Sequence, residues 1–425
     1  MNLGSTISLA WGAPFAGLLL SIAIVPLAAS RFWEKNRNKA IVSALFLAPV
    51  AVMLLVNGAE GRTELAHTLI EYVSFIILLA SLYTISGGIV LEGDIQATPL
   101  TNTTFLGVGA VLANLVGTTG ASMLLIRPLL KTNSERARIK HVVIFFIFIV
   151  SNIGGLLTPL GDPPLFLGFL RGVPFEWTLR LLPIWATAVG AVLAIFFVVD
   201  SWHYNRESLS DRRRDAIEVE PLRLRGNLNF VWLAGVVGSV FLPTPWKEIG
   251  MATAAVLAYA TTNPDLRARN QFSFHAIIEV AILFVGIFVT MVVPVAILKA
   301  RGAELGVREP WHFFWASGVL SSFLDNAPTY VTFVALAQSL TSATGGAPAV
   351  LHLADGGIAE PLLVAISCGC VFMGANTYIG NGPNFMVKAI ADGAGVKMPS
   401  FFGYMGYSAA VLLPIFVFIT FVFFR

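Results

Sequence analysis

The stretch Ser151-Asn-Ile-Gly-Gly-Leu-Leu-Thr-Pro-Leu-Gly-Asp-Pro-Pro164 interrupts a long apolar run with glycines, prolines and one acid. The run that contains it, 140–170, is too long for one ordinary membrane helix. Proline removes a backbone donor and glycine loosens a helix. Such backbone is tolerated at membrane depth only where protein or a water-filled cavity satisfies its polar groups. The stretch therefore predicts a broken helix that lines a polar site inside a membrane.

The rest of the chain has the composition of a polytopic membrane protein. Of its 425 residues, 56% are hydrophobic and only 12% are charged, whereas a soluble domain is about a quarter charged. Six apolar segments precede a polar stretch at 201–226, and six follow it. The segments are 12–30, 39–57, 68–91, 102–130, 140–170 and 178–200, then 228–243, 248–262, 274–299, 310–340, 359–391 and 403–424. We predict an all-α polytopic membrane fold.

Two segments in each half are abnormal. Segments 102–130 and 310–340 are interrupted at Asn114–Ser122 and Ser321–Thr329, which leaves arms of about ten residues that are too short to cross a bilayer. We expect two re-entrant hairpins. Segment 359–391 is interrupted at Gly374–Asn384, just as segment 140–170 is interrupted at Ser151–Pro164.

Each half thus has five crossings, with about ten in total. Because five is odd, successive copies must be inverted, as in many secondary transporters. We predict a first inverted repeat at 1–200, a cytoplasmic inter-repeat loop at 201–226 and a second inverted repeat at 227–425.

The positive-inside rule orients this arrangement. With both termini outside, the cytoplasmic segments hold 19 of the 27 Lys and Arg residues. These segments are 31–39, 92–101, 127–140, 201–226, 263–273 and 388–400. The first hairpin then enters from the cytoplasm and the second from outside.

Two acids stand among the breaks: Asp162 in the first broken helix and Asp325 at the second hairpin tip. An ionised carboxylate at this depth costs about 2.5–3.5 kcal/mol or more, which makes both acids functional candidates. Polar residues surround them in the sequence. The set is Asn114, Thr118, Thr119, Ser122, Ser151, Asn152, Thr158, Ser321, Ser322, Asn326, Thr329, Asn376, Thr377, Asn381 and Asn384.

Carboxylate, hydroxyl, amide and unwound carbonyl oxygens suit a hard cation such as Na⁺ or Li⁺. The same carboxylates can bind protons, so sodium and proton can compete for one site and give exchange. Asp162 and Asp325 are thus candidate Na⁺ ligands. The alternative is that each acid caps a restarting half-helix, and that about half of the Asn, Ser and Thr residues only satisfy backbone.

Other polar residues point to structure rather than chemistry. Glu71 and Glu279 lie in corresponding helices of the two halves and are expected at the interface. Cys368 and Cys370 are expected to pack as small residues in a helix. The sequence contains no nucleophile–base pair and no metal-ligand spacing. We therefore expect no enzyme activity, no cofactor and no nucleic-acid partner.

These motifs resemble those of the ion transporter superfamily. Ser151-Asn152-Ile-Gly-Gly-…-Thr158-Pro-Leu-Gly161-Asp162 is similar to a signature of NhaD-type sodium/proton antiporters. Ser321-Ser-Phe-Leu-Asp325-Asn326-Ala-Pro328 is similar to the Asp-Asn-x-Pro hairpin of the antiporter and arsenite-pump branches. The chain departs from the NhaD-type pattern at Asn114-Leu115, where that family has Asp-Asn, and at Pro163-Pro164, where it has threonines. These departures resemble a CitMHS-like citrate-transport branch.

The resemblance implies an elevator mechanism. A transport part at 101–200 and 309–425 would slide against scaffold helices at 12–91 and 228–299, and the scaffold would form a homodimer surrounded by lipid. The protein would be integral to the bacterial inner membrane.

Three substrates remain open at this point. Sodium/proton antiport fits two buried acids best. Sodium- or proton-coupled uptake of citrate or another carboxylate is the alternative: buried acids repel an anion, although half-helix N-termini favour one. Arsenite extrusion is the third.

Overall fold

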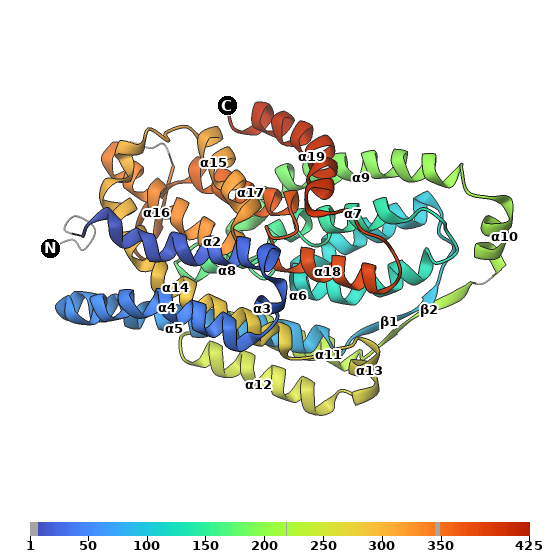
Figure 1. Cartoon of the computed structure of the whole chain (residues 1–425), viewed down its shortest axis with the longest axis horizontal. Coiled ribbons are helices and arrows are strands. Elements are labelled where there is room, and N and C mark those ends of the chain that lie inside the picture. The colour runs from blue at the N-terminus through green and yellow to red at the C-terminus, as the bar shows by residue number, and fades with distance from the viewer. Residues whose placement is uncertain (1–6, 218, 345–348) are drawn as a thin grey trace.

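The computed structural model describes residues 7–217, 219–344 and 349–425, which form an almost entirely helical fold (Figure 1). The prediction of an all-α polytopic membrane protein is confirmed. Within the described residues, eight helices are long and apolar enough to cross a membrane by length and composition. They are Leu9–Pro26, Asn36–Val56, Gly58–Ser86, Pro99–Thr132, Lys140–Leu157, Phe175–Tyr204, His275–Leu305 and Phe401–Phe423. Leu228–Val240 and Glu360–Asn376 are shorter apolar helices, so a total of ten crossings stays a prediction.

The element order of the first half follows the predicted segments. After η1 (Leu9–Gly12) come α2 (Ala13–Ala28), α3 (Ser30–Trp33), α4 (Asn36–Val56), α5 (Gly58–Ser86), β1 (Val90–Asp94), α6 (Pro99–Thr132), α7 (Lys140–Ile149), η2 (Ile153–Leu157), α8 (Pro163–Leu170), η3 (Phe175–Leu181), α9 (Leu182–Tyr204) and α10 (Leu209–Ile217).

The second half repeats this order of plain helices, paired short helices and broken helix. It contains β2 (Glu220–Arg225), α11 (Leu228–Val240), α12 (Trp246–Thr261), α13 (Pro264–Arg269), α14 (His275–Arg301), η4 (Gly302–Leu305), α15 (Pro310–Phe323), α16 (Asn326–Thr344), β3 (Val350–Leu353), β4 (Gly356–Ala359), α17 (Glu360–Met373), η5 (Gly374–Asn376), α18 (Gly382–Gly393) and α19 (Phe401–Phe423).

The first hairpin is folded into α6, which reverses at Gly117. This residue has φ 77° and ψ 155°, a backbone conformation that glycine adopts without the Cβ clash of other residues. The two arms return to the same end of the molecule, because Asn102 and Asn133 exchange side-chain hydrogen bonds of 2.9 and 3.0 Å. The predicted interruption over Asn114–Ser122 was too long, since only Gly117 departs from helical geometry.

The second hairpin consists of α15 and α16, joined at Leu324 and Asp325. Leu324 is extended, with φ −113° and ψ 149°. The outer ends of the two arms come together, since Glu309 before α15 and Thr341 in α16 line one cavity. Both predicted hairpins therefore have their tips in the interior and their open ends together.

The two broken helices share one local geometry. Each break brings two glycine backbones into contact: a Cβ on Gly161 would lie 2.1 Å from the Gly155 carbonyl oxygen, and one on Gly380 would lie 2.5 Å from that of Gly374. No side chain fits at either close approach. Gly161 and Gly380 precede Asp162 and Asn381 respectively, so these two residues hold equivalent positions in the two halves.

The predicted inter-repeat segment 201–226 contains regular structure that the sequence did not indicate. The segment contains the end of α9, the helix α10 and the strand β2, which pairs antiparallel with β1. A small second ribbon, β3–β4, follows α16. Both ribbons are short additions to a helical fold that the apolar pattern could not show, because their residues are mostly polar or exposed.

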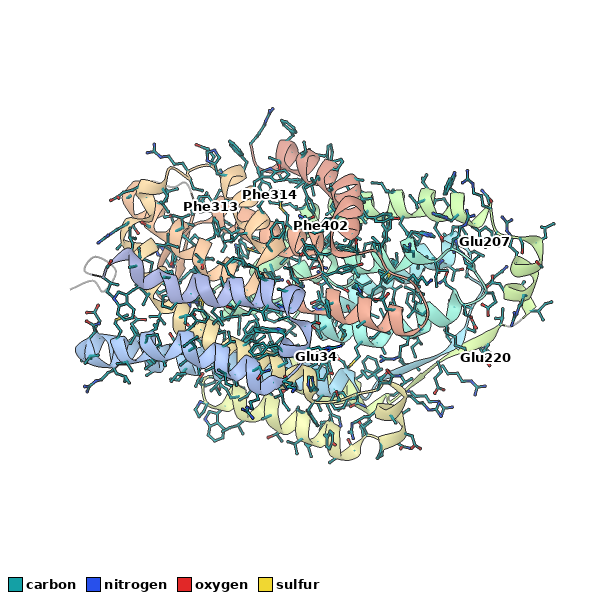
Figure 2. The ribbon with its side chains drawn as sticks, in the orientation of Figure 1. Glu34, Glu207, Glu220, Phe313, Phe314 and Phe402 are labelled. Atoms are coloured by element: carbon teal, nitrogen blue, oxygen red, sulfur yellow. The ribbon has the colours of Figure 1, made fainter. Side chains whose placement is uncertain are left out.

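The β1–β2 ribbon joins several segments that were predicted to be cytoplasmic. Glu92 pairs with Arg225 at 2.6 Å and also with Arg269, and Lys131 pairs with Glu220 at 2.6 Å. In Figure 1 the ribbon and α10 lie towards the right end of the molecule, and α4 extends to the left end. Glu207 and Glu220 mark the same right end in Figure 2.

The core sits around α7. Each residue from Val142 to Ile149 is at most 2% exposed, as expected of a helix that is apolar on all sides and central. By contrast, α4 exposes Leu45, Val52 and Val56, which suits a surface that contacts lipid tails. The fold therefore surrounds the broken helices with protein.

Candidate functional site

Asp162 is the centre of the buried polar region. It is 1% exposed and stands at the N-cap position of α8, yet its side chain makes no capping hydrogen bond. The carboxylate instead accepts three hydrogen bonds from other elements. Thr118 Oγ1 and Asn381 Nδ2 donate to Oδ1 at 2.8 and 3.0 Å, and Asn326 Nδ2 donates to Oδ2 at 2.5 Å.

These donors come from every interrupted element of the fold. Thr118 follows the reversal of α6, Asn326 begins α16, and Asn381 directly precedes α18. Together with α8, four half-helices thus begin beside one carboxylate. The N-terminal end of a helix carries a partial positive charge, so this convergence stabilises an anion.

The two equivalent residues of the repeats contact each other here. Asp162 and Asn381 hold corresponding positions in the two broken helices and are joined by a hydrogen bond. Thr118 and Asn326, from the two hairpins, donate to the same carboxylate. Contact between equivalent elements is what a two-fold relation between the repeats would give.

Asp325 behaves differently. Its Oδ1 accepts a hydrogen bond from the backbone N–H of Ala327 at 3.1 Å, which is an N-terminal cap on α16. The side chain is partly exposed, and the neighbouring Asn326 is the residue that reaches Asp162. The capping interpretation is therefore confirmed for Asp325 and wrong for the side chain of Asp162.

A second group of predicted residues supports the first broken helix. Asn114 Nδ2 donates to the Gly154 carbonyl at 2.7 Å and its Oδ1 accepts from Leu157 N–H, while Thr158 Oγ1 donates to the Asn114 carbonyl at 2.5 Å. Ser122 and Ser151 share a hydrogen bond of 2.7 Å. These side chains fix the unwound backbone against the first hairpin.

Asn152 links the two broken helices. Its Nδ2 donates to Asn384 Oδ1 at 2.7 Å, and Asn384 in turn donates to the Gly374 and Thr377 carbonyls. Asn381 also donates to the Ser151 carbonyl at 3.1 Å. The amide side chains therefore join the two breaks, and Asn381 also holds the backbone of the first one.

The predicted residues of the second hairpin mostly satisfy backbone. Ser321 donates to the Cys370 carbonyl, Ser322 to the Met373 carbonyl, and Thr377 to the Ser322 carbonyl. Asn376 donates to Ser322 Oγ at 3.0 Å. These contacts bind α15 to α17 and η5 rather than to Asp162.

Two further predicted residues lie outside the contacts of Asp162. Thr119 is partly exposed and has no side-chain hydrogen bond within the described residues, and Thr329 donates to the Asp325 carbonyl.

Three buried amide oxygens in this region accept no hydrogen bond within the described part of the chain: Oδ1 of Asn152, of Asn326 and of Asn376. Asn152 and Asn326 are both 0% exposed. A buried acceptor without a donor costs about 1–3 kcal/mol. Such oxygens, together with a carboxylate, are the ligands that a hard monovalent cation prefers.

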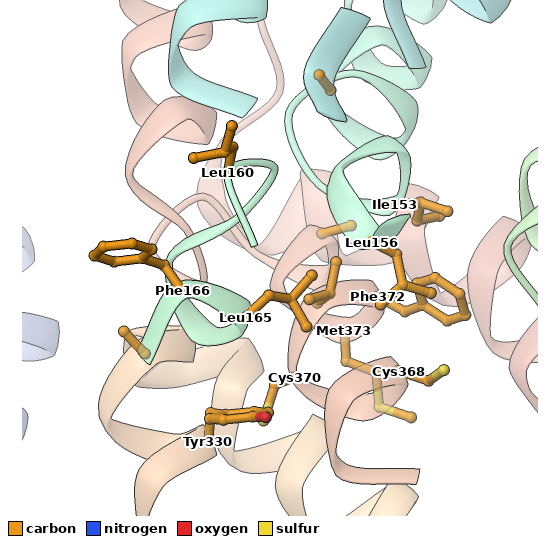
Figure 3. Close-up of a cluster of buried hydrophobic side chains, with 14 of the residues drawn as sticks. Ile153, Leu156, Leu160, Leu165, Phe166, Tyr330, Cys368, Cys370, Phe372 and Met373 are labelled. Carbon is orange, nitrogen blue, oxygen red and sulfur yellow. The ribbon is translucent and has the colours of Figure 1, made fainter. Parts of the chain in front are cut away.

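Apolar packing closes the site on the side of α8, α16 and α17. Figure 3 shows Leu165, Tyr330, Cys370 and Phe372 gathered in one cluster. Cys368 and Cys370 are buried free thiols, which confirms their expected packing role. The described residues contain no group of three or more His, Cys, Asp or Glu side chains that could hold a metal ion.

Sequence reasoning missed two charge clusters, one buried and one partly exposed. In one, Asp200, which is 0% exposed, pairs with Arg136 at 2.5 Å and with His141 at 2.7 Å. Asp200 is the last residue of a predicted apolar segment, where an acid usually lies at the membrane–water interface. The sequence therefore gave no indication that Asp200 is buried.

The other missed cluster joins Arg171 with Glu71 at 3.0 Å and Lys299 with Asp355 at 2.5 Å. Glu279, in the corresponding helix of the second half, pairs instead with Lys39 at 2.7 Å. The pairing partners lie 100 and 56 residues apart along the chain, so only the fold brings them together.

A helical membrane fold with two broken helices and a buried polar centre defines a secondary transporter. Comparison with protein families agrees, because a family model described as "Putative citrate transport" matches residues 4–424. The chain belongs to this family. No curated protein matches it. The protein is therefore an integral membrane transporter, in line with the predicted CitMHS-like resemblance.

Proposed function

We propose that this transporter exchanges sodium for protons, with Asp162 as the carboxylate that binds each of them in turn. The observation that carries the proposal is the environment of Asp162: a carboxylate that is 1% exposed, has only neutral hydrogen-bond donors and makes no ion pair within the described residues. A buried carboxylate without a cationic partner is costly unless a proton or a cation neutralises it.

The residues around Asp162 have two proposed roles. Thr118, Asn326 and Asn381 orient the carboxylate, and the unpartnered oxygens of Asn152 and Asn326 provide further ligands for Na⁺. Asp325, on the neighbouring hairpin tip, is proposed as the second acid of the ion path. A proton on Asp162 removes the charge that attracts Na⁺, so the two ions exclude each other and exchange follows.

The proposed movement is an elevator. The part at 101–200 and 309–425 contains all four elements that meet at Asp162, so it would carry the ion site as one unit. The helices at 12–91 and 228–299 would form the fixed scaffold and the interface of a homodimer.

Proteoliposomes test the proposal. A pH gradient across vesicles that contain the protein should dissipate when Na⁺ or Li⁺ is added, and Asp162→Asn should abolish this response. Asp325→Asn should reduce the rate of this sodium-driven dissipation at least tenfold. Because Asn caps helices as well as Asp does, such a loss would show that the charge of Asp325, and not its cap, is needed. Asp392→Asn is the matched control, since this carboxylate on α18 is exposed and pairs with Lys388. Normal sodium-driven proton flux in Asp162→Asn would refute the assignment of the ion site.

Citrate uptake coupled to sodium or protons is the second candidate, and the family description favours it. Four half-helix N-termini could attract an anion once Asp162 is neutralised. Labelled citrate accumulation in the same vesicles, without cation-driven proton movement, would replace antiport by this function.

A further inference from the structure

A cavity of about 750 Å³ lies among the segment before α7, the start of α7, the end of α9, the α18–α19 connection and α19, and it is lined neither by Asp162 nor by the residues that contact Asp162. Arg138 before α7, Lys140 at the start of α7 and Lys397 between α18 and α19 line it. All three are exposed and have no ion-pair partner within the described residues. Three cations that face one cavity without carboxylates to pair with them repel one another.

A buried network of hydrogen bonds and ion pairs holds the segment that carries Arg138 and Lys140. Arg136 is 6% exposed and its two terminal nitrogens contact Asp200 at 2.5 and 3.1 Å. Asn133, at the end of α6, and Asn102 join the same network. Asp200 is thereby fully engaged, since His141 also contacts it, and its charge does not neutralise Arg138 or Lys140. Glu207 is nearby but accepts a hydrogen bond from the Ala137 backbone.

Two nitrogens at the cavity have no partner. Nε of Arg136 and Nδ1 of His203 are buried and make no hydrogen bond within the described part of the chain, and both residues line the cavity. His203 stacks on His141 with ring centroids 4.2 Å apart. A ligand that accepts hydrogen bonds and carries negative charge would complete this wall.

Part of the cavity lining is apolar. Phe145, Val199 and Val411 form this part, together with the exposed ring of Tyr407 on α19. Trp202, one turn beyond Val199 on α9, is 49% exposed, and Arg206 stacks over it at 3.5 Å. Aromatic rings at helix ends mark the membrane–water interface. The cavity thus combines a cationic rim with an apolar wall at the depth where phospholipid headgroups lie.

We infer that this cavity binds an anionic phospholipid, with its phosphate against Arg138, Lys140 and Lys397 and an acyl chain along Tyr407 and Val411. Basic pockets between transmembrane helices bind lipid headgroups in this way. The phosphate chemistry alone would also suit a free phosphate ester, but the apolar wall favours a lipid. The inference is independent of the proposed ion exchange.

Native mass spectrometry of the purified full chain tests it. The protein is first delipidated and then titrated with one lipid at a time. Phosphatidylglycerol should bind, and phosphatidylcholine should bind at least tenfold more weakly. The triple variant Arg138→Ala/Lys140→Ala/Lys397→Ala should lose this preference, because each basic side chain near an anionic lipid contributes a factor of roughly five. Val411→Trp, which fills the apolar wall, should weaken phosphatidylglycerol binding while leaving all three charges in place.

The matched control is Arg31→Ala/Lys35→Ala/Arg37→Ala, which removes three exposed cations from another predicted cytoplasmic segment and should keep the preference. Equal phosphatidylglycerol binding by the wild type and the triple variant would overturn the inference. So would glycerol 3-phosphate that competes as well as the whole lipid, since the site would then bind a soluble phosphate ester. Thermal unfolding of each variant in detergent shows that it remains folded.

Discussion

Asp162 and Asp325 both stand at the start of a helix, yet their carboxylates have different partners. Asp325 accepts the backbone N–H of Ala327, two residues ahead. Asp162 has prolines at the first two positions of α8, and a proline has no N–H to donate. The side chain of Asp162 is therefore left to accept donors from Thr118, Asn326 and Asn381. The proline pair that departs from the antiporter signature is thus part of what directs this carboxylate into the site.

Asn326→Ala should slow ion exchange about tenfold. The change removes the 2.5 Å hydrogen bond on Asp162 Oδ2, and a hydrogen bond to a charged group contributes about 1.5–3 kcal/mol. Initial rates of sodium-driven proton movement in proteoliposomes measure the effect. Thr332→Ala is the control, because its hydroxyl bonds within the same helix, to the Pro328 carbonyl. An unchanged rate in Asn326→Ala would mean that this amide does not position the acid.

At the residue scale, the sequence could identify Asp162 but not its partners. Asp162 stood out because an acid in an apolar run is rare. The residues that contact it are 44, 164 and 219 positions away, and period or composition carries no information about such pairs. Ser321 and Ser322 were predicted for the same site as polar residues, yet they donate to backbone carbonyls of α17 and not to Asp162.

The elements that build the site depend on glycines at points of reversal or contact. Gly117 lets α6 turn back within the protein, and its absent Cβ would lie 3.2 Å from the Leu160 carbonyl. The sequence predicted this hairpin from arm length, but it placed the break over nine residues because Asn, Thr and Gly are all weak helix formers. In the structure the other residues remain helical, since their side chains find partners in the neighbouring break.

Gly117→Ala should destabilise the fold by about 1–2 kcal/mol, the cost of left-handed backbone for a residue with a Cβ, and should impair transport. Thermal unfolding in detergent measures it. Gly190→Ala on α9 is the matched control, since nothing lies within 4 Å of its Cβ position, and Ala is the better helix former there. Equal melting temperatures for the two variants would contradict the role of the reversal.

The β1–β2 ribbon makes a separate prediction about pH. Burial, with the charge of Glu135 close by, raises the pKa of Asp94 from 3.8 to about 6, and Glu220 lies opposite it in the ladder. A raised pKa means that the folded protein binds this proton more tightly than the unfolded chain does. Ionised Asp94 therefore costs stability above pH 6, and the cost disappears below about pH 4.

Asp94→Asn should thus raise the free energy of unfolding at pH 7 to 8 by on the order of 1 kcal/mol and leave it unchanged near pH 4. Melting temperatures of the variant and the wild type across this range measure the difference. A gain that is equally large at pH 4 would show that charge is not its cause.

In the whole molecule, two ion pairs join the helices proposed as scaffold to the part proposed to move. Glu71 on α5 pairs with Arg171 after α8, and Lys299 on α14 pairs with Asp355 between β3 and β4. All four side chains are partly exposed, between 12% and 31%. If the transport part slides, both pairs must break in each cycle.

Glu71→Gln should therefore raise the maximal transport rate about two- to fivefold, as expected from the loss of a pair that contributes about 0.5–1 kcal/mol to one state. Glu279→Gln is the matched control, since its partner Lys39 lies on α4 within the same proposed scaffold. Rates at saturating Na⁺ measure both. Equal rates in Glu71→Gln and Glu279→Gln would argue against relative movement at this contact.

The meeting of both halves at one carboxylate also has a consequence for inheritance. The two halves of a duplicated gene can usually change independently of each other. Here Thr118 lies in the same half as Asp162, and Asn326 and Asn381 lie in the other half, so a change in either half alters the surroundings of Asp162. A substitution at one of these positions therefore requires a compensating substitution at another. In related chains the four positions should therefore change together, as one inherited unit, while the lipid-facing helices around them vary freely.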